Sequence, residues 1–322
     1  MSFRASLFAR RLVITLATIV ALVAIAAGAV YTWPLDDDEL TPASQRFTFA
    51  AATARIAAQA RAEEADLGIR AECRSRALLH PEVTAKAVLM LHGYLGCPAQ
   101  FAELAMRYHE HSYNVYMPLL PRHGTVDPDG HTALTAQELT AFAGSAMDVT
   151  ASLGSEAGVA GSSAGALLAT WLTTTRPEQV HRLLAVAPFY RPSSEQAPSV
   201  FVKPMAVLYG FRILPDRRHP VGFSYAVLAQ FMRLSLLLDI NPTLPALRDV
   251  AVVTSPRDRF IDLKRATSVP AAIAEANGIC LRSYEIPPEA NVGHEAIDLA
   301  SLGPAKDALY LRYIDLYEAA VR

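Results

Sequence analysis

The sequence has few charged residues, few cysteines and no internal repeat. Only 19% of its 322 residues are charged while 52% are hydrophobic, a balance that excludes an intrinsically disordered chain. Its three cysteines, Cys73, Cys97 and Cys280, form no C-x-x-C pair, so nothing indicates structural zinc. No segment recurs at a fixed period, which argues against a solenoid or propeller. The length suits one large α/β domain or two small ones.

Beyond the N-terminal segment, acidic residues outnumber basic ones. Three of the 29 Lys and Arg residues precede residue 34, whereas all 31 acidic residues follow it, so residues 34–322 carry a net charge of −5 with histidine neutral. Nucleic-acid binding draws on clustered positive charge. We therefore expect no nucleic-acid partner.

One segment near the N-terminus is long and free of charge. Leu12–Trp33 is 22 residues long, and a bilayer core needs about 20 apolar residues in a helix. Three arginines precede the segment and the acidic run Asp36–Glu39 follows it. The positive-inside rule then predicts a cytoplasmic stretch at residues 1–11 and a domain on the periplasmic or extracellular side.

Two forms of this segment fit the sequence. The length of residues 12–33 and the aromatic pair Tyr31 and Trp33 favour an uncleaved transmembrane signal anchor. Ala27-Gly28-Ala29 could instead be the cleavage site of a signal peptide, which would make the protein secreted. A buried core helix is the third reading, and the flanking charges argue against it.

The rest of the chain divides into a connecting segment and a domain. Residues 34–68 are an acidic, proline-containing linker and a helix over Ala43–Leu67, and residues 69–322 form the domain. Its first strand is expected over Ile69–Leu79. Strands and helices then alternate, as in a mainly parallel sheet covered on both faces. The strands expected are Ala87–Leu91, Tyr113–Pro118, Ala157–Gly161, Arg182–Ala187, Val250–Thr254 and Gly278–Ile286. The helices expected are one after Pro98, then Leu134–Leu153, Ala164–Thr174 and a closing helix over 295–320.

A long stretch interrupts the alternation between two expected strands. Residues 188–249 are rich in Phe, Tyr and Met, and prolines at positions 192, 198, 204, 215 and 220 break their apolar stretches. This is too long for a plain connection, so we expect an inserted helical cap over the site. The alternative is one more packed helix with long loops.

The strongest chemical motif is Gly161-Ser162-Ser163-Ala164-Gly165, which matches G-x-S-x-G between an expected strand and an expected helix. Such a turn exposes the hydroxyl of its central serine, and the small flanking residues let the backbone bend. The pattern therefore selects Ser163 rather than Ser162 as a nucleophile.

A serine hydroxyl needs a histidine base that is oriented by a carboxylate. In enzymes with this motif, the partners follow in the order Ser, acid, His. Asp258 lies just past the strand Val250–Thr254, and His294 lies past the last expected strand. Asp262 competes with Asp258, although it could equally begin the next helix.

These motifs resemble the α/β-hydrolase superfamily, close to its bacterial carboxylesterases and monoacylglycerol lipases. The resemblance covers about residues 69–320. It departs from the pattern at Ser162, where relatives often have a bulky residue. The residues that carry it are Leu91–Gly96, Pro118–Thr125, Gly161–Gly165, Asp258 and Val292–His294.

The resemblance implies a serine carboxylic ester hydrolase that works through an acyl-enzyme without metal or organic cofactor. Ser163 would be the nucleophile, His294 the base and Asp258 its orienting acid. The backbone N–H groups of Tyr94 and Ala164 would form the oxyanion hole, and we expect His92 to brace that loop.

The substrate would be a small ester. The apolar cap and the position at a membrane favour a lipid-like one. Amide or peptide hydrolysis and acyl transfer use the same triad, so they remain alternatives. A non-catalytic binding protein that inherited the fold is a third hypothesis, against which the complete triad argues.

Two of the cysteines suggest a disulfide. Cys73 lies in the strand that we expect to neighbour Ala87–Leu91, and Cys97 lies just beyond that strand. In an oxidising compartment, a bridge between them would brace the oxyanion loop. The alternative is two small buried thiols.

Overall fold

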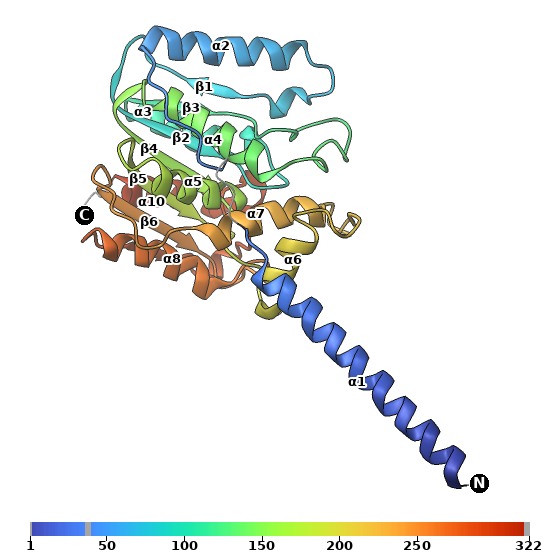
Figure 1. Ribbon diagram of the computed structural model, residues 1–322. Helices are drawn as coiled ribbons and strands as arrows, with labels where there is room; N and C mark the ends of the chain where they lie inside the picture. The colour runs from blue at the N-terminus through green and yellow to red at the C-terminus, as the bar shows by residue number, and fades with distance from the viewer. Residues whose placement is uncertain (1, 36–39, 319–322) are drawn as a thin grey trace.

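A single seven-stranded sheet forms the centre of the computed structural model, which describes residues 2–35 and 40–318 (Figure 1). The strand order is β1-β3-β2-β4-β5-β6-β7. All neighbours pair in parallel except β1, which runs antiparallel to β3. The strands are β1 (Arg76–Leu78), β2 (Thr84–Leu91), β3 (Tyr113–Met117), β4 (Gly154–Ser162), β5 (Val180–Val186), β6 (Asp249–Thr254) and β7 (Arg282–Glu285).

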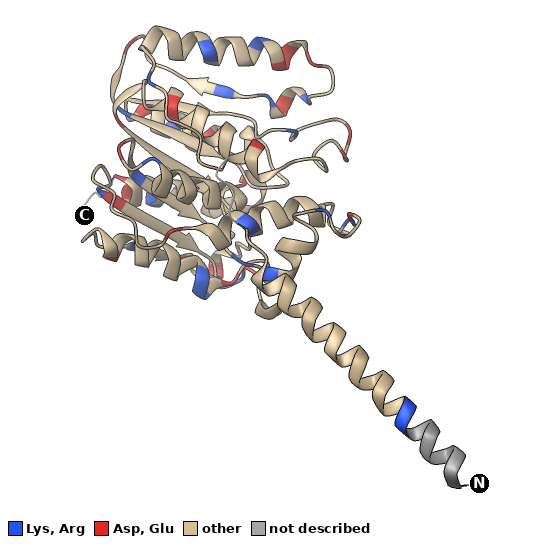
Figure 2. Ribbon diagram, viewed as in Figure 1, with Lys and Arg blue, Asp and Glu red and all other residues tan. Residues whose placement is uncertain are grey.

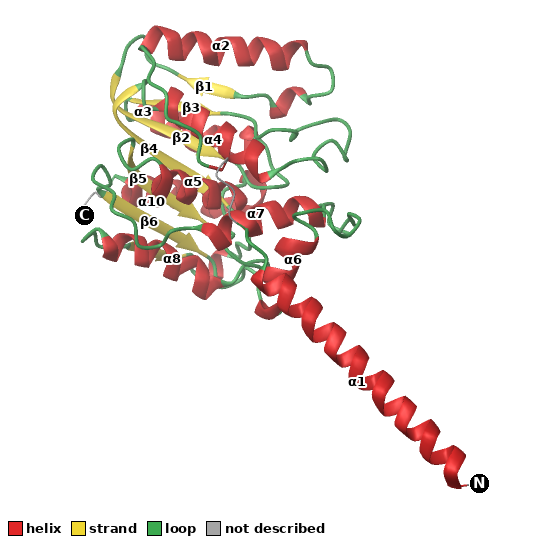
Figure 3. Ribbon diagram, viewed as in Figure 1, coloured by secondary structure: helices red, strands yellow, loops and turns green. Residues whose placement is uncertain are grey.

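Helices cover both faces of the sheet (Figure 3). On one face, α4 (Ala136–Thr150) and α5 (Ala164–Thr175) contact each other and the central strands. On the other, α3 (Ala102–Glu110) meets α10 (Lys306–Tyr317), where the ring centroids of Tyr108 and Tyr317 are 5.3 Å apart. The structure also contains α2 (Phe49–Ala65), α8 (Leu263–Ala276) and the short α9 (Leu299–Leu302).

Strands covered on both faces need apolar side chains on both faces, which accounts for the unbroken hydrophobic runs that predicted them. In β2, every residue from Ala87 to Leu91 is buried. The next three strands in the sheet order are β4, β5 and β6. Every residue in the carboxyl half of each is buried. The fold is therefore a doubly covered, mainly parallel α/β sheet, as the sequence predicts.

The expected strand Ile69–Leu79 is wrong in both length and position. Only β1 is a strand; Cys73 lies in a short 3-10 turn (Ala71–Cys73), and Ile69 bridges to Thr125. Because β1 pairs with β3, it does not neighbour β2. Backbone bonds to the loop after β3, such as Arg70 N–H to the Gly124 carbonyl at 2.9 Å, hold the segment away from the sheet centre.

Two expected helices are shorter than predicted. The first begins at Phe49 instead of Ala43, because the side chain of Thr48 caps it and Gln45 N–H donates to Asp148 instead, at 2.9 Å. The closing helix is broken between α9 and α10 by Gly303, which has a φ of +49°, and Pro304. Residues 319 and 320, where we expected its end, lie outside the described residues.

The segment between β5 and β6 contains two helices, α6 (Val202–Leu208) and α7 (Tyr225–Leu237), which contact each other. Helix α7 also contacts α4 and α5. In Figure 1 this cap lies beyond the arrowheads of the strands. It therefore lies beside the carboxyl edge of the sheet, where sites of open parallel sheets form.

The N-terminal helix α1 (Ser2–Thr32) runs away from the domain. Within its stretch Arg10–Thr32, an 18-residue window has a mean hydropathy of 2.6 and no buried residue. Figure 2 shows it without charge beyond Arg11. By length and composition the helix can cross a membrane, which is compatible with an anchor or a signal peptide. The acidic run 36–39, part of the expected linker, lies outside the described residues.

Candidate active site

Ser163 occupies a tight turn between β4 and α5. Its φ of 54° and ψ of −117° lie in a region that residues with a side chain rarely adopt. The two glycines of the motif permit this turn. A Cβ on Gly161 would lie 2.3 Å from the carbonyl oxygen of Gly165, and one on Gly165 would lie 2.0 Å from that of Leu91. The G-x-S-x-G spacing therefore follows from backbone crowding on both sides of the serine.

The three predicted catalytic side chains meet at this turn. The Nε2 atom of His294 is 2.8 Å from Ser163 Oγ, and its Nδ1 atom is 2.7 Å from Asp258 Oδ2. The side chain of Asp258 is fully buried and that of His294 is 13% exposed. The geometry is that of a nucleophile, a base and an orienting acid.

The loops that carry the acid and the histidine are held to each other. Asp258 Oδ1 accepts the backbone N–H of Phe260 at 2.8 Å, which leaves Oδ2 facing the imidazole. Ser255, at the end of β6, donates its hydroxyl to the carbonyl of Val292 at 2.5 Å. These bonds fix the acid relative to the histidine loop, although the two residues are 36 positions apart.

The competing aspartate, Asp262, has the structural role that the sequence allowed. Its side chain caps α8 by accepting the N–H of Arg265 at 2.9 Å, and it also pairs with Arg191. It makes no hydrogen bond to His294 among the described residues. This geometry leaves Asp258 as the carboxylate that contacts the histidine.

Tyr94 and Ala164 both line the cavity beside Ser163. No hydrogen bond within the described part of the chain uses the backbone N–H of either residue, so both groups can serve an oxyanion. The hydroxyl of Tyr94 points into the cap, where it accepts the N–H of Ser224 at 2.9 Å. Its hydroxyl pKa is raised, because the ring is buried. The loop after β2 is thus tied to the beginning of α7.

His92 lies beneath this loop and braces it, as expected. Its Nδ1 faces the Gly93 carbonyl at 2.8 Å, and its Nε2 accepts the N–H of Leu120 at 3.0 Å. Because Nε2 accepts, the ring is neutral. Burial, reinforced by the nearby His123, lowers the pKa of His92 to about 3. Burial also lowers the pKa of His123 to about 4.

Cys73 and Cys97 form a disulfide, with their Cα atoms 5.1 Å apart. The disulfide was expected, but the element that carries Cys73 was not. Cys73 lies in a turn near the edge of the sheet and not in a strand beside β2. Both cysteines are buried. Cys97 directly precedes the 3-10 turn Pro98–Phe101, so the bridge lies at the far end of the Tyr94 loop. Cys280 is a free, exposed thiol.

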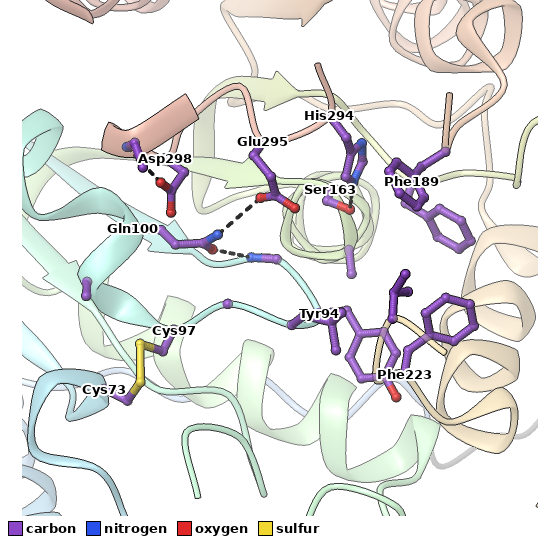
Figure 4. Close-up of a pocket in the computed structure, with 18 of the residues that line it drawn as sticks. Cys73, Tyr94, Cys97, Gln100, Ser163, Phe189, Phe223, His294, Glu295 and Asp298 are labelled. Carbon is purple, nitrogen blue, oxygen red and sulfur yellow. Dashed lines mark hydrogen bonds between the residues drawn. A yellow bond between two sulfur atoms is a disulfide. The ribbon is translucent and has the colours of Figure 1, made fainter. Parts of the chain in front are cut away.

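Ser163 opens into a cavity of about 720 Å³, a usual size for a small-molecule site. Figure 4 shows that its two ends differ. Phe189, Phe223 and the Tyr94 ring lie toward the cap, whereas Gln100, Glu295 and Asp298 lie on the other side of Ser163. The cavity therefore offers an apolar end and a polar end to a substrate that is bound across the serine.

Sequence reasoning missed the residue that links the oxyanion loop to the histidine loop. Gln100 Oε1 accepts the N–H of Gly93 at 3.2 Å, and its Nε2 lies 3.4 Å from Glu295 Oε2 (Figure 4). Glu295 directly follows His294 in the sequence, which was the available signal. No local pattern marks Gln100, because its role depends on contacts across the fold.

A family model described as the alpha/beta hydrolase family matches residues 88–301. The chain belongs to this family. The match includes Ser163, Asp258 and His294, together with the loop of Tyr94 and the whole cap. No curated protein sequence matches the chain.

Several solved structures share the fold. One of the metagenome-derived lipolytic enzymes LipS and LipT aligns over 78% of this chain and 100% of its own, with 17% identity and a TM-score of 0.61. The monoacylglycerol lipase of Paleococcus ferrophilus covers 76% and 98%, at 15% identity and a TM-score of 0.54. A soluble variant of the monoglyceride lipase of Saccharomyces cerevisiae covers 76% and 91%, at 10% identity and a TM-score of 0.54. At these identities the likeness is one of fold.

Proposed function

We propose that this protein is a serine hydrolase that cleaves carboxylic esters through an acyl-enzyme. The observation that carries the proposal is the position of His294, whose Nε2 lies 2.8 Å from Ser163 Oγ and whose Nδ1 lies 2.7 Å from Asp258 Oδ2. A hydroxyl becomes an effective nucleophile when a neutral imidazole can accept its proton. The tight turn at Ser163 exposes that hydroxyl to the cavity.

In this mechanism, Ser163 Oγ attacks the ester carbonyl carbon while His294 Nε2 accepts the hydroxyl proton. The negative charge that forms on the carbonyl oxygen is stabilised by the N–H groups of Tyr94 and Ala164, each typically worth ~10²–10³ in turnover. The intermediate then expels the alcohol, which takes its proton from His294. Water repeats these steps on the acyl-enzyme and releases the acid, while Asp258 keeps Nδ1–H oriented.

The two ends of the cavity support an acyl ester with a polar alcohol as substrate. The apolar end beneath the cap fits a hydrocarbon chain, and the end near Gln100 and Glu295 fits a hydroxylated leaving group. The lipolytic and monoacylglycerol lipase names of the fold relatives agree with this assignment. We propose a lipid-like ester carrying one acyl chain.

We further propose that α1 is an uncleaved anchor that holds the domain on the non-cytoplasmic side of a membrane. The arginines before the apolar segment support this orientation. The Cys73–Cys97 disulfide agrees with it, because such bonds persist in oxidising compartments.

The test uses the full chain in detergent micelles and p-nitrophenyl esters of two to sixteen carbons, with Ser163→Ala as the matched control. We expect the variant to keep its fold and to lose turnover by roughly 10⁴-fold or more. The acyl-chain length with the highest kcat/KM would indicate the length of the apolar end of the cavity. A fluorophosphonate should label Ser163 in the parent protein only.

The remaining outcomes separate the alternatives. Labelling without ester turnover would indicate amide hydrolysis or transfer of the acyl group to an acceptor other than water. A folded protein that is neither labelled nor active would refute the proposed triad and favour a binding function.

A further inference from the structure

Five large apolar side chains are exposed together on the outer side of the cap. Between 36% and 56% of each is accessible to solvent. They come from the 3-10 turn before α6 and from the loop after it, and we call them the cap face. Its members are Val200, Phe201, Phe211, Ile213 and Leu214. Exposed apolar clusters on a folded domain mark surfaces that contact something apolar.

The cap face adjoins the end of α1. Lys203 Nζ donates to the carbonyl of Trp33 at 2.8 Å, and the hydroxyl of Tyr31 donates to the carbonyl of Val200. The Trp33 ring lies 6.0 Å from that of Phe211. The apolar surface of the helix therefore continues onto the cap without a flexible break between them.

The exposed loop of the cap is held firmly from behind. Residues 211–221 connect α6 to the segment before α7, and two of their arginines reach the loop before α4. Arg212 donates to the carbonyl of Thr132 at 2.8 Å, and Arg218 pairs with Asp129 at 2.6 Å. Because polar contacts fix the backbone, Ile213 and Leu214 are exposed in an ordered loop and not through fraying.

The direction of α1 indicates what the cap face contacts. The helix leaves the domain at α6, and the loop between α6 and α7 projects on the same side of the domain (Figure 1). A bilayer crossed by α1 would begin where Tyr31 and Trp33 end the apolar stretch, at the level expected for interfacial aromatics. Lys203, two residues after Phe201, and Arg217, three residues after Leu214, are cations that suit anionic lipid headgroups.

We propose that the cap face docks on the surface of the same phospholipid bilayer that α1 crosses. The proposal rests on the anchor assigned to α1 under the proposed function. Val221, in the same loop, is exposed and also lines the cavity, so docking places one wall of the cavity entrance at the lipid surface. A single-chain ester can then pass from the bilayer to Ser163 without crossing bulk water.

The experiment places an environment-sensitive NBD dye at single cysteines of the full chain in phosphatidylcholine–phosphatidylglycerol vesicles. The cap probe is Ile213→Cys in a Cys280→Ser background, and the matched control is the native thiol of Cys280. That thiol is exposed and precedes β7, at the amino edge of the sheet, away from the cavity. A third probe, Val20→Cys, reports whether α1 is inserted.

We expect the probes at 213 and 20 to gain fluorescence several-fold and to resist iodide quenching, with Cys280 remaining accessible. Nitroxide lipids labelled near the headgroup should quench the probe at 213. A probe at 213 that is as accessible as Cys280 while Val20 is protected would overturn the docking and leave the anchor standing. An accessible Val20 probe would overturn both. Protection that nitroxide lipids do not quench would assign the face to a second copy of the chain.

A kinetic readout distinguishes docking from catalysis. Phe201→Ser with Ile213→Ser should raise the apparent KM for a long-chain ester embedded in vesicles about tenfold, while turnover of a soluble short-chain ester stays unchanged. Leu67→Ser, an exposed leucine distant from the cap, should alter neither. Equal losses on both substrates would contradict docking, whereas inactivity of the parent on every ester would count against the proposed function and leave the probe results valid.

Discussion

Ser163, Asp258 and His294 come from turns at the ends of hydrogen-bonded strands, whereas Phe223 and Leu228 reach the same cavity from the cap. The first group depends on a backbone that two glycines and several buried bonds fix in place. The second depends on side chains of a segment with its own helices. On the proposed function, we expect the sheet loops to set the chemistry and the cap to recognise the acyl chain. Perturbing each region separately tests this division.

The largest structural effect should come from the glycines of the serine turn. Gly161→Ala places a methyl group 2.3 Å from the Gly165 carbonyl, so we expect a loss of at least about 3 kcal/mol in unfolding free energy, measured with urea. Gly293→Ala is the matched control, because its Cβ meets no atom within 4 Å although it lies beside His294. Comparable losses in the two variants would show that crowding does not constrain the turn.

Lowering the pH should weaken the loops at the strand ends. His92 and His123 stay neutral in the fold down to about pH 3 and 4, whereas in the unfolded chain they take up protons near pH 6.5. The free energy of unfolding therefore falls as the pH drops below 6.5. Each of the two histidines lowers it by up to about 1.4 kcal/mol for each pH unit. We expect a loss of roughly 4 kcal/mol between pH 7 and pH 5.

Urea unfolding at the two pH values measures this loss. His123→Phe should reduce the slope by about half, while replacement of the exposed His111 by Asn should leave it unchanged. A stability that is flat from pH 7 to pH 5 would show that neither buried ring resists protonation.

Removing the disulfide should have an effect of similar or smaller size. Cys73→Ser with Cys97→Ser opens a loop with a sequence separation of 24 and should cost about 3 kcal/mol of stability, seen as a lower Tm. Ester turnover should fall as well, since the bridge lies at the end of the Tyr94 loop. Cys280→Ser, which removes the exposed thiol, is the control and should change neither quantity.

The smallest change tests the link between the two regions. Tyr94→Phe leaves the buried N–H of Ser224 without its partner, at a cost of about 1 kcal/mol. If this hydrogen bond couples the position of the loop after β2 to that of the cap, kcat/KM for long-chain esters should fall more than kcat/KM for acetate esters. Tyr225→Phe keeps the ring contacts of a neighbouring cap tyrosine and is the comparison. An equal decrease for all chain lengths would argue against such a link.

The sequence predicted the parts of this protein that local rules determine. The strands β2 to β6 and the turn at Ser163 follow from apolar runs and from the glycine spacing, and the structure brings the three predicted side chains together. The strand expected over Gly278–Ile286 is shorter, because only Arg282–Glu285 forms β7. Their catalytic roles stay predictions. The position of β1 could not be predicted, because pairing with β3 instead of β2 is decided by contacts far along the chain. The break in the closing helix had a signal in Gly303-Pro304 that the helical spacing of apolar residues obscured.

The cavity lining was the least predictable part. Phe189 and Gln100 contact the site only after the cap and the loops have packed, and neither belongs to a motif. The cap itself was expected from the length of residues 188–249, but not which of its aromatic residues face Ser163. Residues that act through distant contacts leave no periodic signal in a single sequence.

The two edges of the sheet have a consequence for a protein held at a membrane. An anchor confines its copies to a plane, where collisions between domains are far more frequent than in dilute solution. Exposed strand edges then invite pairing between molecules. Here the edge strands β1 and β7 are only three and four residues long, and they carry Arg76 and Arg282. Such short, charged edges offer little template for strand pairing between copies, which would suit a domain that α1, on the proposed function, holds at a membrane surface.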